Sequence, residues 1–563
     1  MRVTIVLLGS LLAAVDAIKN PIISGWNPDP SILRVGKEYF IATSSFEYFP
    51  GTPIYKSTDL ANWELYSHAQ TTPEHVQLYG VPTGAGVWAP SLSFINGQFY
   101  LASMTRWTYD PTARVWPRVY FSSSKDLITW TKPTWCEPWG IDPSLFQDPV
   151  TGKTYLNLMA PNNNIDRIWG IYQCEVSLTT GNCVGEYISL WNGTLPHNSS
   201  ARDEGPKMFY KDEYYYLLIA EGGTDDLHRA TIARSSSPQG PWTPAPNNPI
   251  LFNGAYGYDN FTVQSTGHAT FVETLEGDWY AAFLARRKIN GTSPLGRETF
   301  LTTVTWKEGW PTLNDGKPIL LSESFGSTPD QTYPPPPFKD TFSNSDLDPS
   351  WYQLRVPYTN NYNTGKTKNS KYPTSGIIFS PNVFSLSDRD TPSAVLRKQK
   401  SLNMTFSAAL LATNGSLGYL QSVGISAYLS EFQHQDIGIR GCVNQTGMCM
   451  YSTLLMNGTS VTNQIPLNST SIPDNITLII RAEPLKYTFG FTIGSEPTVW
   501  MANIASSWLA FAPANWFVFE GASFALFASG NGNPWSFDAP AVGFKEVNEV
   551  YFEEGIPDHD VWA

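Results

Sequence analysis

Charged residues are scarce in this chain of 563 residues, and clusters of basic residues are absent. Asp, Glu, Lys and Arg together make up 15% of the sequence, against about 25% in typical soluble domains. The net charge is −13. Because nucleic acids are bound through clustered Lys and Arg, we expect no nucleic-acid partner. The composition also argues against an intrinsically disordered chain or a long coiled coil.

Long apolar runs are equally rare. Residues 1–17 contain one, with Arg2 as the charged start, apolar residues over Val3–Val15 and a small-residue cleavage site ending at Ala17. This order is typical of a secretory signal, and the run is too short to span a bilayer well. A membrane anchor is the alternative interpretation. We therefore expect a secreted, extracellular protein without a membrane partner.

Cysteine is the third scarce feature, with five residues in all. Cys174 lies close in sequence to Cys183, and Cys442 to Cys449, so each pair can close a hairpin loop in an oxidising compartment. Cys136 is left over, and we expect it to be buried. The sequence has neither a Cys-x-x-Cys motif nor a mixed His/Cys ligand spacing, so we predict no zinc site.

Asn-x-Ser/Thr sequences are frequent. A eukaryotic secretory pathway glycosylates such positions when they are exposed, so we predict a glycoprotein. The ten sequences are at Asn192, Asn198, Asn260, Asn290, Asn403, Asn414, Asn444, Asn457, Asn468 and Asn475.

Aromatic and turn-forming residues are abundant. Phe, Trp and Tyr make up 14% of the chain, and Gly and Pro number 43 each. Many turns favour an all-β protein. Low charge with many rings suits a neutral polar ligand that stacks on aromatic side chains, such as a sugar. A plain core role is an equally good interpretation of any single ring.

One sequence pattern recurs five times in the first 320 residues. The copies start near Asp29, Ala89, Asp142, Glu204 and His268, at intervals of 60, 53, 62 and 64 residues. Each copy has a short apolar strand, a Gly/Asp turn, an alternating aromatic strand and a third strand, often followed by an outer strand opening at Trp. Four-stranded antiparallel units at this spacing predict a five-bladed β-propeller. A single β-sandwich with chance similarity is the alternative.

The repeat predicts where a functional site lies. The innermost strand of each blade runs beside the central axis, so the copy starts converge at one end of it. Those positions hold Asp29, the stretch Trp88-Ala89-Pro90, Asp142, Glu204 and His268. Three carboxylates packed together are costly, which favours a functional role over a structural one.

Such a cluster suits the hydrolysis of a glycosidic bond. That reaction needs one acid to protonate the leaving oxygen and a carboxylate to activate water. Asp29 and Glu204 come from blades one and four, and their separation would leave room for a water molecule and so give inversion. Asp142 lies between them and would raise the pKa of the acid by charge repulsion.

Eight stretches together resemble glycoside hydrolase family 43, and more narrowly its β-xylosidase and α-L-arabinofuranosidase branch. The resemblance implies a five-bladed propeller and an inverting mechanism, with Asp29 as general base, Glu204 as general acid and Asp142 as the carboxylate that tunes the pKa. The stretches are residues 27–32, 43–51, 86–94, 141–148, 203–207, 220–224, 266–274 and 293–299.

The same resemblance implies the sugar contacts. Phe46 and Trp88 match aromatic wall residues, and Arg297 matches an arginine that binds sugar hydroxyls. His268 matches an axial histidine, which in some relatives lies beside a calcium ion. We expect a hydrogen-bonding role for His268, with no cofactor required and no metal ligands assigned. His228 also matches a family position, but a plain loop histidine explains it equally well.

A composition change marks a second domain. We predict a signal peptide over 1–17, a propeller over 18–321, a Pro-rich linker over 322–338 and an all-β sandwich over 339–563. The last part resembles the C-terminal jelly-roll, concanavalin-like domain of this branch, which lends a loop to the pocket rim. In residues 519–525 Ser523, followed by Phe524, stands where β-xylosidases tend to have an aromatic. Together with the short loop 288–292, this difference could open the pocket.

These observations predict an exo-acting hydrolase that releases terminal pentose from xylan-derived oligosaccharides or arabinoxylan. β-D-Xylosidase activity is the first expectation, and α-L-arabinofuranosidase activity is the alternative. A non-catalytic carbohydrate-binding propeller is a distant alternative, since it would not need Asp29, Asp142 and Glu204 together. The boxes of sialidases and the Asn-Asp-Pro-Asn motif of retaining fructosidases are absent from the sequence.

Overall fold

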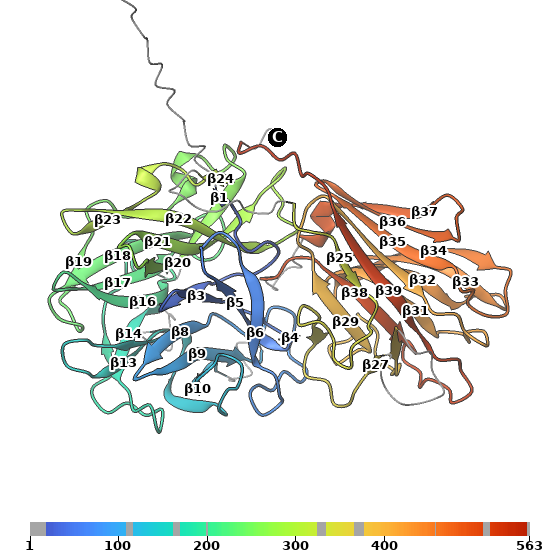
Figure 1. Cartoon of the computed structure of the whole chain (residues 1–563), viewed down its shortest axis with the longest axis horizontal. Coiled ribbons are helices and arrows are strands. Elements are labelled where there is room, and N and C mark those ends of the chain that lie inside the picture. Colours follow the sequence, from blue (N-terminus) through green and yellow to red (C-terminus); the bar gives the residue numbers. More distant parts are fainter. Residues whose placement is uncertain are drawn as a thin grey trace, which may run out of the picture.

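The computed structural model describes residues 18–108, 116–161, 169–198, 201–323, 334–364, 376–456, 458–510 and 518–559. The predicted signal segment 1–17 and the glycosylation sequence at Asn457 lie outside these residues. The chain forms two all-β parts that lie side by side, a propeller and a sandwich (Figure 1). The all-β prediction is confirmed.

Five antiparallel sheets form the five blades of the propeller, as predicted. The first blade is β2 (Ser31–Val35), β3 (Glu38–Ala42), β5 (Gly51–Ser57) and β6 (Glu64–Gln70); the second is β8 (Ser91–Ile95), β9 (Gln98–Arg106), β10 (Arg118–Ser124) and β11 (Thr134–Trp139), with β7 (Gly86–Val87) also on β9; the third is β12 (Ile141–Gln147), β13 (Thr154–Pro161), β14 (Trp169–Glu175) and β15 (Ile188–Ser189); the fourth is β16 (Glu204–Lys211), β17 (Tyr214–Glu221), β18 (Arg229–Ser235) and β19 (Thr243–Pro244); the fifth is β20 (Val263–Glu273), β21 (Trp279–Arg287), β22 (Arg297–Lys307) and β23 (Trp310–Leu313).

Apolar side chains on both faces of the blades explain why these sheets stack around an axis. In β17 every residue after Tyr214 is buried, because the strand lies between β16 and β18 and both of its faces meet neighbouring blades. One core cluster joins Phe121, Leu156 and Leu217, from three successive blades. Strands buried on both sides read as nearly continuous apolar runs, which matches the sequence.

The ring is closed by its own first residues. β1 (Ile18–Lys19) pairs with β24 (Ser322–Glu323), which follows the fifth blade, and Ile23 bridges to Thr299 in β22. The predicted linker over 322–338 thus begins in β24 and ends at Phe338, where β25 starts.

Two packed sheets form the sandwich. Its core holds Phe406, Ile425, Leu478 and Phe524, all fully buried. One sheet contains β25 (Phe338–Asp340), β27 (Tyr362–Thr364), β28 (Ile377–Phe379), β39 (Val542–Tyr551), β30 (Met404–Leu410), β35 (Ile476–Glu483), β36 (Lys486–Ile493) and β37 (Val499–Ala505); the other contains β29 (Ala394–Lys398), β38 (Ser523–Ser529), β31 (Ser422–Ser430), β32 (Gln433–Gly441), β33 (Met448–Met456) and β34 (Thr459–Leu467).

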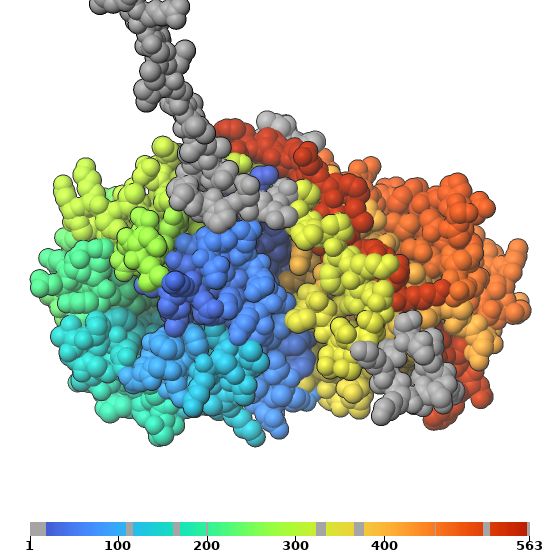
Figure 2. Space-filling model, in the orientation of Figure 1, coloured from blue at the N-terminus to red at the C-terminus, as the bar shows by residue number. Residues whose placement is uncertain are grey.

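The two parts are in contact, and the described residues that begin the sandwich side, drawn in yellow, lie along the seam between them (Figure 2). β4 (Tyr48–Phe49) of the propeller pairs with β26 (Gln353–Leu354) on the sandwich side. One buried cluster joins Trp26 and Tyr48 to Tyr352 and Phe527. The sandwich is therefore packed directly against the propeller.

The remaining described features are few. Disulfides join Cys174 to Cys183 and Cys442 to Cys449, and Cys136 is a buried free thiol, as predicted. The helices in the described ranges are single 3₁₀ turns at η1 (Asn253–Tyr256), η2 (Asn314–Gly316) and η3 (Ser506–Leu509). Within those ranges, no helix has the length and apolar character needed to cross a membrane.

Candidate active site

The start of the innermost strand has an unusual backbone in several blades. Asp29, Asp142 and His268 have φ values of 59°, 53° and 48°, and Gly205, next to Glu204, has a φ of 61°. The strand pairing slips at these points in the third, fourth and fifth blades. A bulge of this kind redirects a side chain, and left-handed backbone is uncommon outside Gly, Asn and Asp. The repeated sequence pattern thus produces a repeated local geometry at the axis.

The predicted site residues meet at one cavity of about 650 Å³. It contains all seven: Asp29, Phe46, Trp88, Asp142, Glu204, His268 and Arg297. Three acids, two rings, a histidine and an arginine that are far apart in sequence therefore share one space.

Asp29 is held from two sides. Ser44 Oγ donates to Asp29 Oδ2 at 2.6 Å, and Arg297 Nη1 donates to Asp29 Oδ1 at 3.0 Å. Arg297 Nη1 also donates to Thr224 Oγ1 at 2.9 Å. These donors fix the orientation of the carboxylate at the mouth of the first blade.

Asp142 and Glu204 are coupled acids. The backbone N–H of Gly205 donates to Asp142 Oδ2 at 2.9 Å, which ties the two blades together. Burial, together with the charges of Asp142 and Asp29, raises the pKa of Glu204 to about 8, in the direction that the sequence predicted for an acid beside another carboxylate. Burial, followed by the charge of Asp29, raises the pKa of Asp142 to about 7. Glu204 therefore carries a proton near neutral pH.

A buried lysine and two buried histidines lie close to these acids. Burial lowers the pKa of Lys207 to about 8, although the charges of Asp142 and Asp29 oppose this, and its Nζ has no hydrogen-bond partner. His268 Nδ1 lies 3.8 Å from Asp29 Oδ1, and burial lowers the pKa of His268 well below its usual value. Both His268 and His228 have an Nε2 atom without a partner. A neutral His268 suits a hydrogen-bonding role.

The cavity walls are aromatic and come from both parts of the molecule. The ring of Phe519, from the sandwich, stacks on Phe46 with centroids 6.0 Å apart and meets Trp88 edge-on at 5.4 Å. The guanidinium of Arg106 lies 5.0 Å from the centroid of the Trp88 ring. Phe46 and Trp88 are thus wall residues, as the resemblance implied.

Several cavity residues were not predicted from the sequence. They include Arg106, Trp169 and Arg202, which line the cavity, and Asp226, which forms an ion pair with Lys288 at the rim. Arg106 and Trp169 lie at strand ends of the second and third blades, so alignment of the outer repeat positions could have found them. Phe519 lies in the stretch 519–525, and its position confirms that this stretch of the sandwich reaches the cavity, as the resemblance implied.

The expectation for residues 519–525 needs a correction. Ser523 is fully buried and its hydroxyl accepts a hydrogen bond from Trp26 Nε1 at 3.1 Å. Phe524 belongs to the sandwich core, where it stacks on Phe406. The aromatic that closes the pocket is Phe519, so Ser523 does not open it. The short loop 288–292 does contribute to the cavity, through Lys288, Gly291 and Thr292.

The surroundings of His268 bear on a metal site. Within the described ranges, no group of three or more His, Cys, Asp or Glu side chains could hold a metal ion. Calcium prefers six to eight oxygen ligands, so the side chains here do not form a calcium site by themselves. A calcium ion beside His268, as the resemblance implies for some relatives, stays the untested alternative to the hydrogen-bonding role expected for this residue.

Comparison with protein families identifies the fold and its chemistry. Residues 18–311 match the model of glycosyl hydrolases family 43, and residues 339–539 match the β-xylosidase C-terminal concanavalin A-like domain. The chain belongs to glycosyl hydrolase family 43. Like other family 43 members, it is a glycoside hydrolase.

Characterised relatives in family 43 include two kinds of pentosidase. The chain is 34% identical over 415 residues to a non-reducing end α-L-arabinofuranosidase of Bacteroides ovatus, covering 72% of this chain and 74% of that protein. It is 36% identical over 359 residues to a β-xylosidase of Bacillus subtilis, covering 61% and 66%. The chain is thus a member of the xylosidase and arabinofuranosidase branch.

Solved family 43 structures match over nearly the whole chain. The Bacteroides ovatus xyloglucan-locus protein superposes with a TM-score of 0.83 at 28% identity, covering 95% of this chain and all of that one. A xylan β-1,4-xylosidase of Bacillus halodurans gives the same score and identity, with coverage of 94% and 99%. Both the propeller and the sandwich of this chain therefore have counterparts in these family 43 structures.

Proposed function

We propose that this protein is a secreted, inverting exo-hydrolase that releases terminal β-D-xylose from xylan-derived oligosaccharides. The supporting observation is the group of Asp29, Asp142 and Glu204, three acids from three blades that line one cavity. Inversion requires a general acid and a general base on opposite sides of the sugar.

In this proposal Glu204 donates its proton to the glycosidic oxygen as the bond breaks. Its raised pKa keeps the proton available near neutral pH. Asp29 accepts a proton from the water that attacks the anomeric carbon, and Ser44 and Arg297 hold its carboxylate in place. Asp142 keeps the pKa of Glu204 high and accepts the N–H of Gly205.

The pocket walls support an exo mode of attack. Phe519 covers Phe46 and Trp88 from the sandwich side, while Lys288 and Asp226 form an ion pair at the rim. A cavity of about 650 Å³ with these walls suits one terminal sugar and part of the next. Arg297 and His268 present polar atoms to the hydroxyl groups of that sugar.

α-L-Arabinofuranosidase activity is the second candidate function. The Bacteroides ovatus relative bears that name, and relatives from Butyrivibrio fibrisolvens and Humicola insolens are named xylosidase/arabinosidase. Both sugars are pentoses with similarly placed hydroxyls, so the same polar groups can serve either.

Release of p-nitrophenol from the β-D-xylopyranoside and the α-L-arabinofuranoside distinguishes these two functions. We expect a higher kcat/KM on the xyloside; the reverse ranking makes arabinofuranosidase the main activity. Product NMR would report the anomeric configuration and so test inversion.

A substitution tests the assignment of the general acid. Glu204→Gln should abolish turnover of natural oligosaccharides, whereas Glu213→Gln, which changes an exposed residue of the same blade, should not. Activity retained in Glu204→Gln with an unchanged pH profile would refute the assignment of the acid and favour a different catalytic group.

Secretion and glycosylation are part of the proposal. The signal-like residues 1–17 and the two disulfides support export. Asn260, Asn290 and Asn475 are among the exposed glycosylation sequences. Expression in a eukaryotic host should give a mature chain that starts near residue 18 in the medium and loses mass with an endoglycosidase. An uncleaved chain retained in the cell would contradict this.

A further inference from the structure

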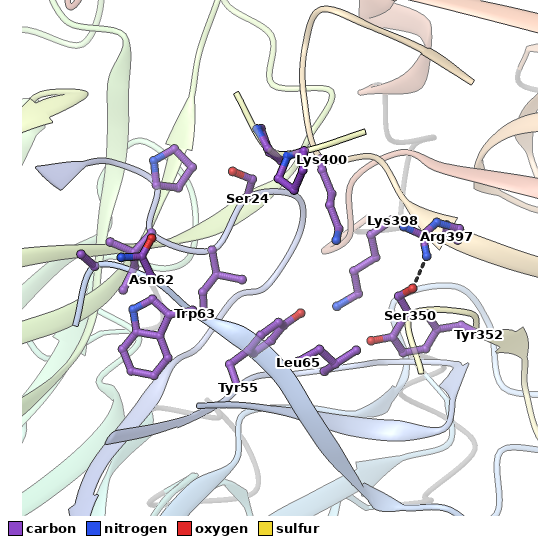
Figure 3. A pocket seen from close by; sticks show the side chains of 16 residues that line it. Ser24, Tyr55, Asn62, Trp63, Leu65, Ser350, Tyr352, Arg397, Lys398 and Lys400 are labelled. Atoms are coloured by element: carbon purple, nitrogen blue, oxygen red, sulfur yellow. Dashed lines mark hydrogen bonds between the residues drawn. The ribbon is translucent and has the colours of Figure 1, made fainter. Parts of the chain in front are cut away.

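A second cavity of about 280 Å³ lies between the propeller and the sandwich, apart from the active site (Figure 3). Ser24, Tyr55 and Trp63 form its propeller side. Tyr352 and three basic residues close together in the sequence form its sandwich side. Those cations are Arg397, Lys398 and Lys400. Of the described residues that line this cavity, none is acidic.

Arg397 is already neutralised. Its Nε and Nη2 atoms donate to the two carboxylate oxygens of the buried Glu549 at 2.9 and 3.1 Å. Its Nη1 contacts Ser350 Oγ, and Asp348 lies 3.8 Å away. This arginine needs no further anion.

Lys398 and Lys400 form no such ion pair with a described residue, although the charges of Glu549 and Asp348 act on Lys400 from a distance. Lys398 is almost fully buried, and its Nζ donates to the neutral Asn27 Oδ1 at 2.9 Å and lies 3.8 Å from the centroid of the Trp26 ring. Lys400 has neither a hydrogen bond nor an ion pair with any described residue, and it is only partly exposed. Figure 3 shows both side chains reaching into the cavity from the sandwich side.

Two lysine ammonium groups that share one cavity without an ion pair are unfavourable. Burial lowers the pKa of both lysines; the charge of Lys400 adds to the shift of Lys398, and the charges of Glu549 and Asp348 only partly oppose the shift of Lys400. An anion that bridged them would replace lost hydration with charge-assisted hydrogen bonds. Ser24 and Tyr55 line the propeller wall of the cavity, where the Tyr55 hydroxyl donates to Asn27 Oδ1.

We propose that this interdomain cavity is a binding site for a small oxyanion, held chiefly by Lys398 and Lys400. The ligand class is a compact anion with at least two acceptor oxygens, either an inorganic oxyanion or the carboxylate of a sugar acid. The volume admits either. The site does not depend on the proposed function of the active-site cavity.

The site is connected to the general-base loop. Asn27 Oδ1 accepts from Lys398 Nζ at 2.9 Å and from Tyr55 Oη at 2.8 Å. Asn27 lies two residues before Asp29. An anion that orders Lys398 therefore also acts on the loop that presents Asp29, and its main effect is expected on stability.

Titration of the full chain with inorganic phosphate, at constant ionic strength set by sodium chloride, tests the proposal. Calorimetry should show saturable binding, and the melting temperature should rise with phosphate concentration. Lys400→Met should weaken phosphate binding at least tenfold. Since Lys398→Met removes a buried interface contact and could impair folding, Lys400→Met is the deciding variant.

Two lysine variants serve as matched controls. Lys486→Met changes an exposed lysine of the sandwich, and Lys288→Met changes the lysine of the active-site cavity. Neither should alter phosphate affinity. Equal stabilisation by chloride, unchanged affinity in Lys400→Met, or loss of binding in Lys288→Met would each overturn the proposal.

Comparison of phosphate with D-glucuronate identifies the source of the anion. Tighter binding of phosphate assigns the site to inorganic oxyanions, and tighter binding of glucuronate assigns it to sugar acids. Absence of binding by both rejects the site.

Discussion

The most consequential residues are acids whose charges interact. The charge of Asp142 is a cause of the raised pKa of Glu204, so removing that charge should lower it. We predict that Asp142→Asn shifts the basic limb of the kcat/KM–pH profile, set near pH 8 by Glu204, to lower pH. Arg202→Met should shift the same limb upward, because the charge of Arg202 lowers the pKa of Glu204. Profiles on p-nitrophenyl xyloside measure both shifts; an unmoved limb in both variants would contradict the assignment of that limb to Glu204.

Asp203, next to the acid, gives a prediction about stability. Both of its carboxylate oxygens lack hydrogen-bond partners, and burial followed by the charge of Glu221 raises its pKa to about 8. The folded state therefore holds the proton of Asp203 more tightly than the unfolded state does. The contribution of this proton to the free energy of unfolding is complete below the ordinary pKa of an aspartate, about 4. It is lost as the pH rises toward 8.

Asp203→Asn cannot ionise, so it should escape this loss. Denaturant unfolding at pH 5 and pH 8 should show a smaller fall in the free energy of unfolding for the variant than for the natural chain. The difference should be at least about 1 kcal/mol, the equivalent of one pKa unit. Equal falls would mean that Asp203 does not retain its proton in the folded state.

At the scale of the strand, the bulge at the start of the fourth blade requires a residue without a Cβ atom at position 205. Gly205 has a left-handed backbone, and a Cβ built there would lie 2.9 Å from the His268 ring. We predict that Gly205→Ala folds but displaces His268 and Glu204, with a loss of kcat of about 100-fold, since a shift of about 1 Å in an active site has that effect.

Gly36→Ala is the matched control for this prediction. Gly36 has nearly the same φ, 62°, and no atom lies within 4 Å of its built Cβ. Gly36→Ala therefore has the same unfavourable left-handed backbone as Gly205→Ala but no steric contact. The kcat of Gly36→Ala should stay near that of the natural chain. Equal losses in both variants would point to general strain instead of displacement of the site.

The strand repeat also explains what could be predicted from the sequence. Asp29, Asp142 and Glu204 occupy equivalent places in the repeat, so the geometry of a propeller brings them together without knowledge of side-chain contacts. The short turns and alternating aromatic strands likewise defined the blades, because strand period and turn chemistry are local properties.

The parts that were not predicted depend on contacts between distant segments. Phe519 is 222 residues beyond Arg297, to which it offers a backbone oxygen at 3.4 Å. The family resemblance placed residues 519–525 at the pocket rim but indicated position 523 for the aromatic, and only the packing of the loop shows that Phe519 is the ring in the cavity. The position of Lys398 in the second cavity could not be predicted from the sequence either, because it follows only from how the sandwich packs on the propeller.

At the scale of the whole molecule, the interface joins two parts that could otherwise unfold separately. Trp26 is fully buried between Tyr48 and the sandwich, and its Nε1 donates to Ser523. We predict one cooperative thermal transition for the natural chain. Trp26→Ala should lower stability by about 3–5 kcal/mol and split the transition into two.

Phe406→Ala provides the comparison for the interface variant. Phe406 is buried wholly within the sandwich core, so its loss should destabilise the chain without separating the transitions of the two parts. Calorimetry distinguishes these results. A single transition in Trp26→Ala would mean that other interface contacts suffice for cooperativity.

The construction of the pocket has a consequence for how this enzyme can change. The acids proposed to break the bond lie at or beside the starts of propeller strands, whereas Phe519 lies on a loop of the sandwich, 222 residues beyond Arg297 in the chain. A gene library that varies only residues 518–521 would therefore sample new sugars above an unaltered set of acids. Substrate specificity can therefore change while the three acids stay the same.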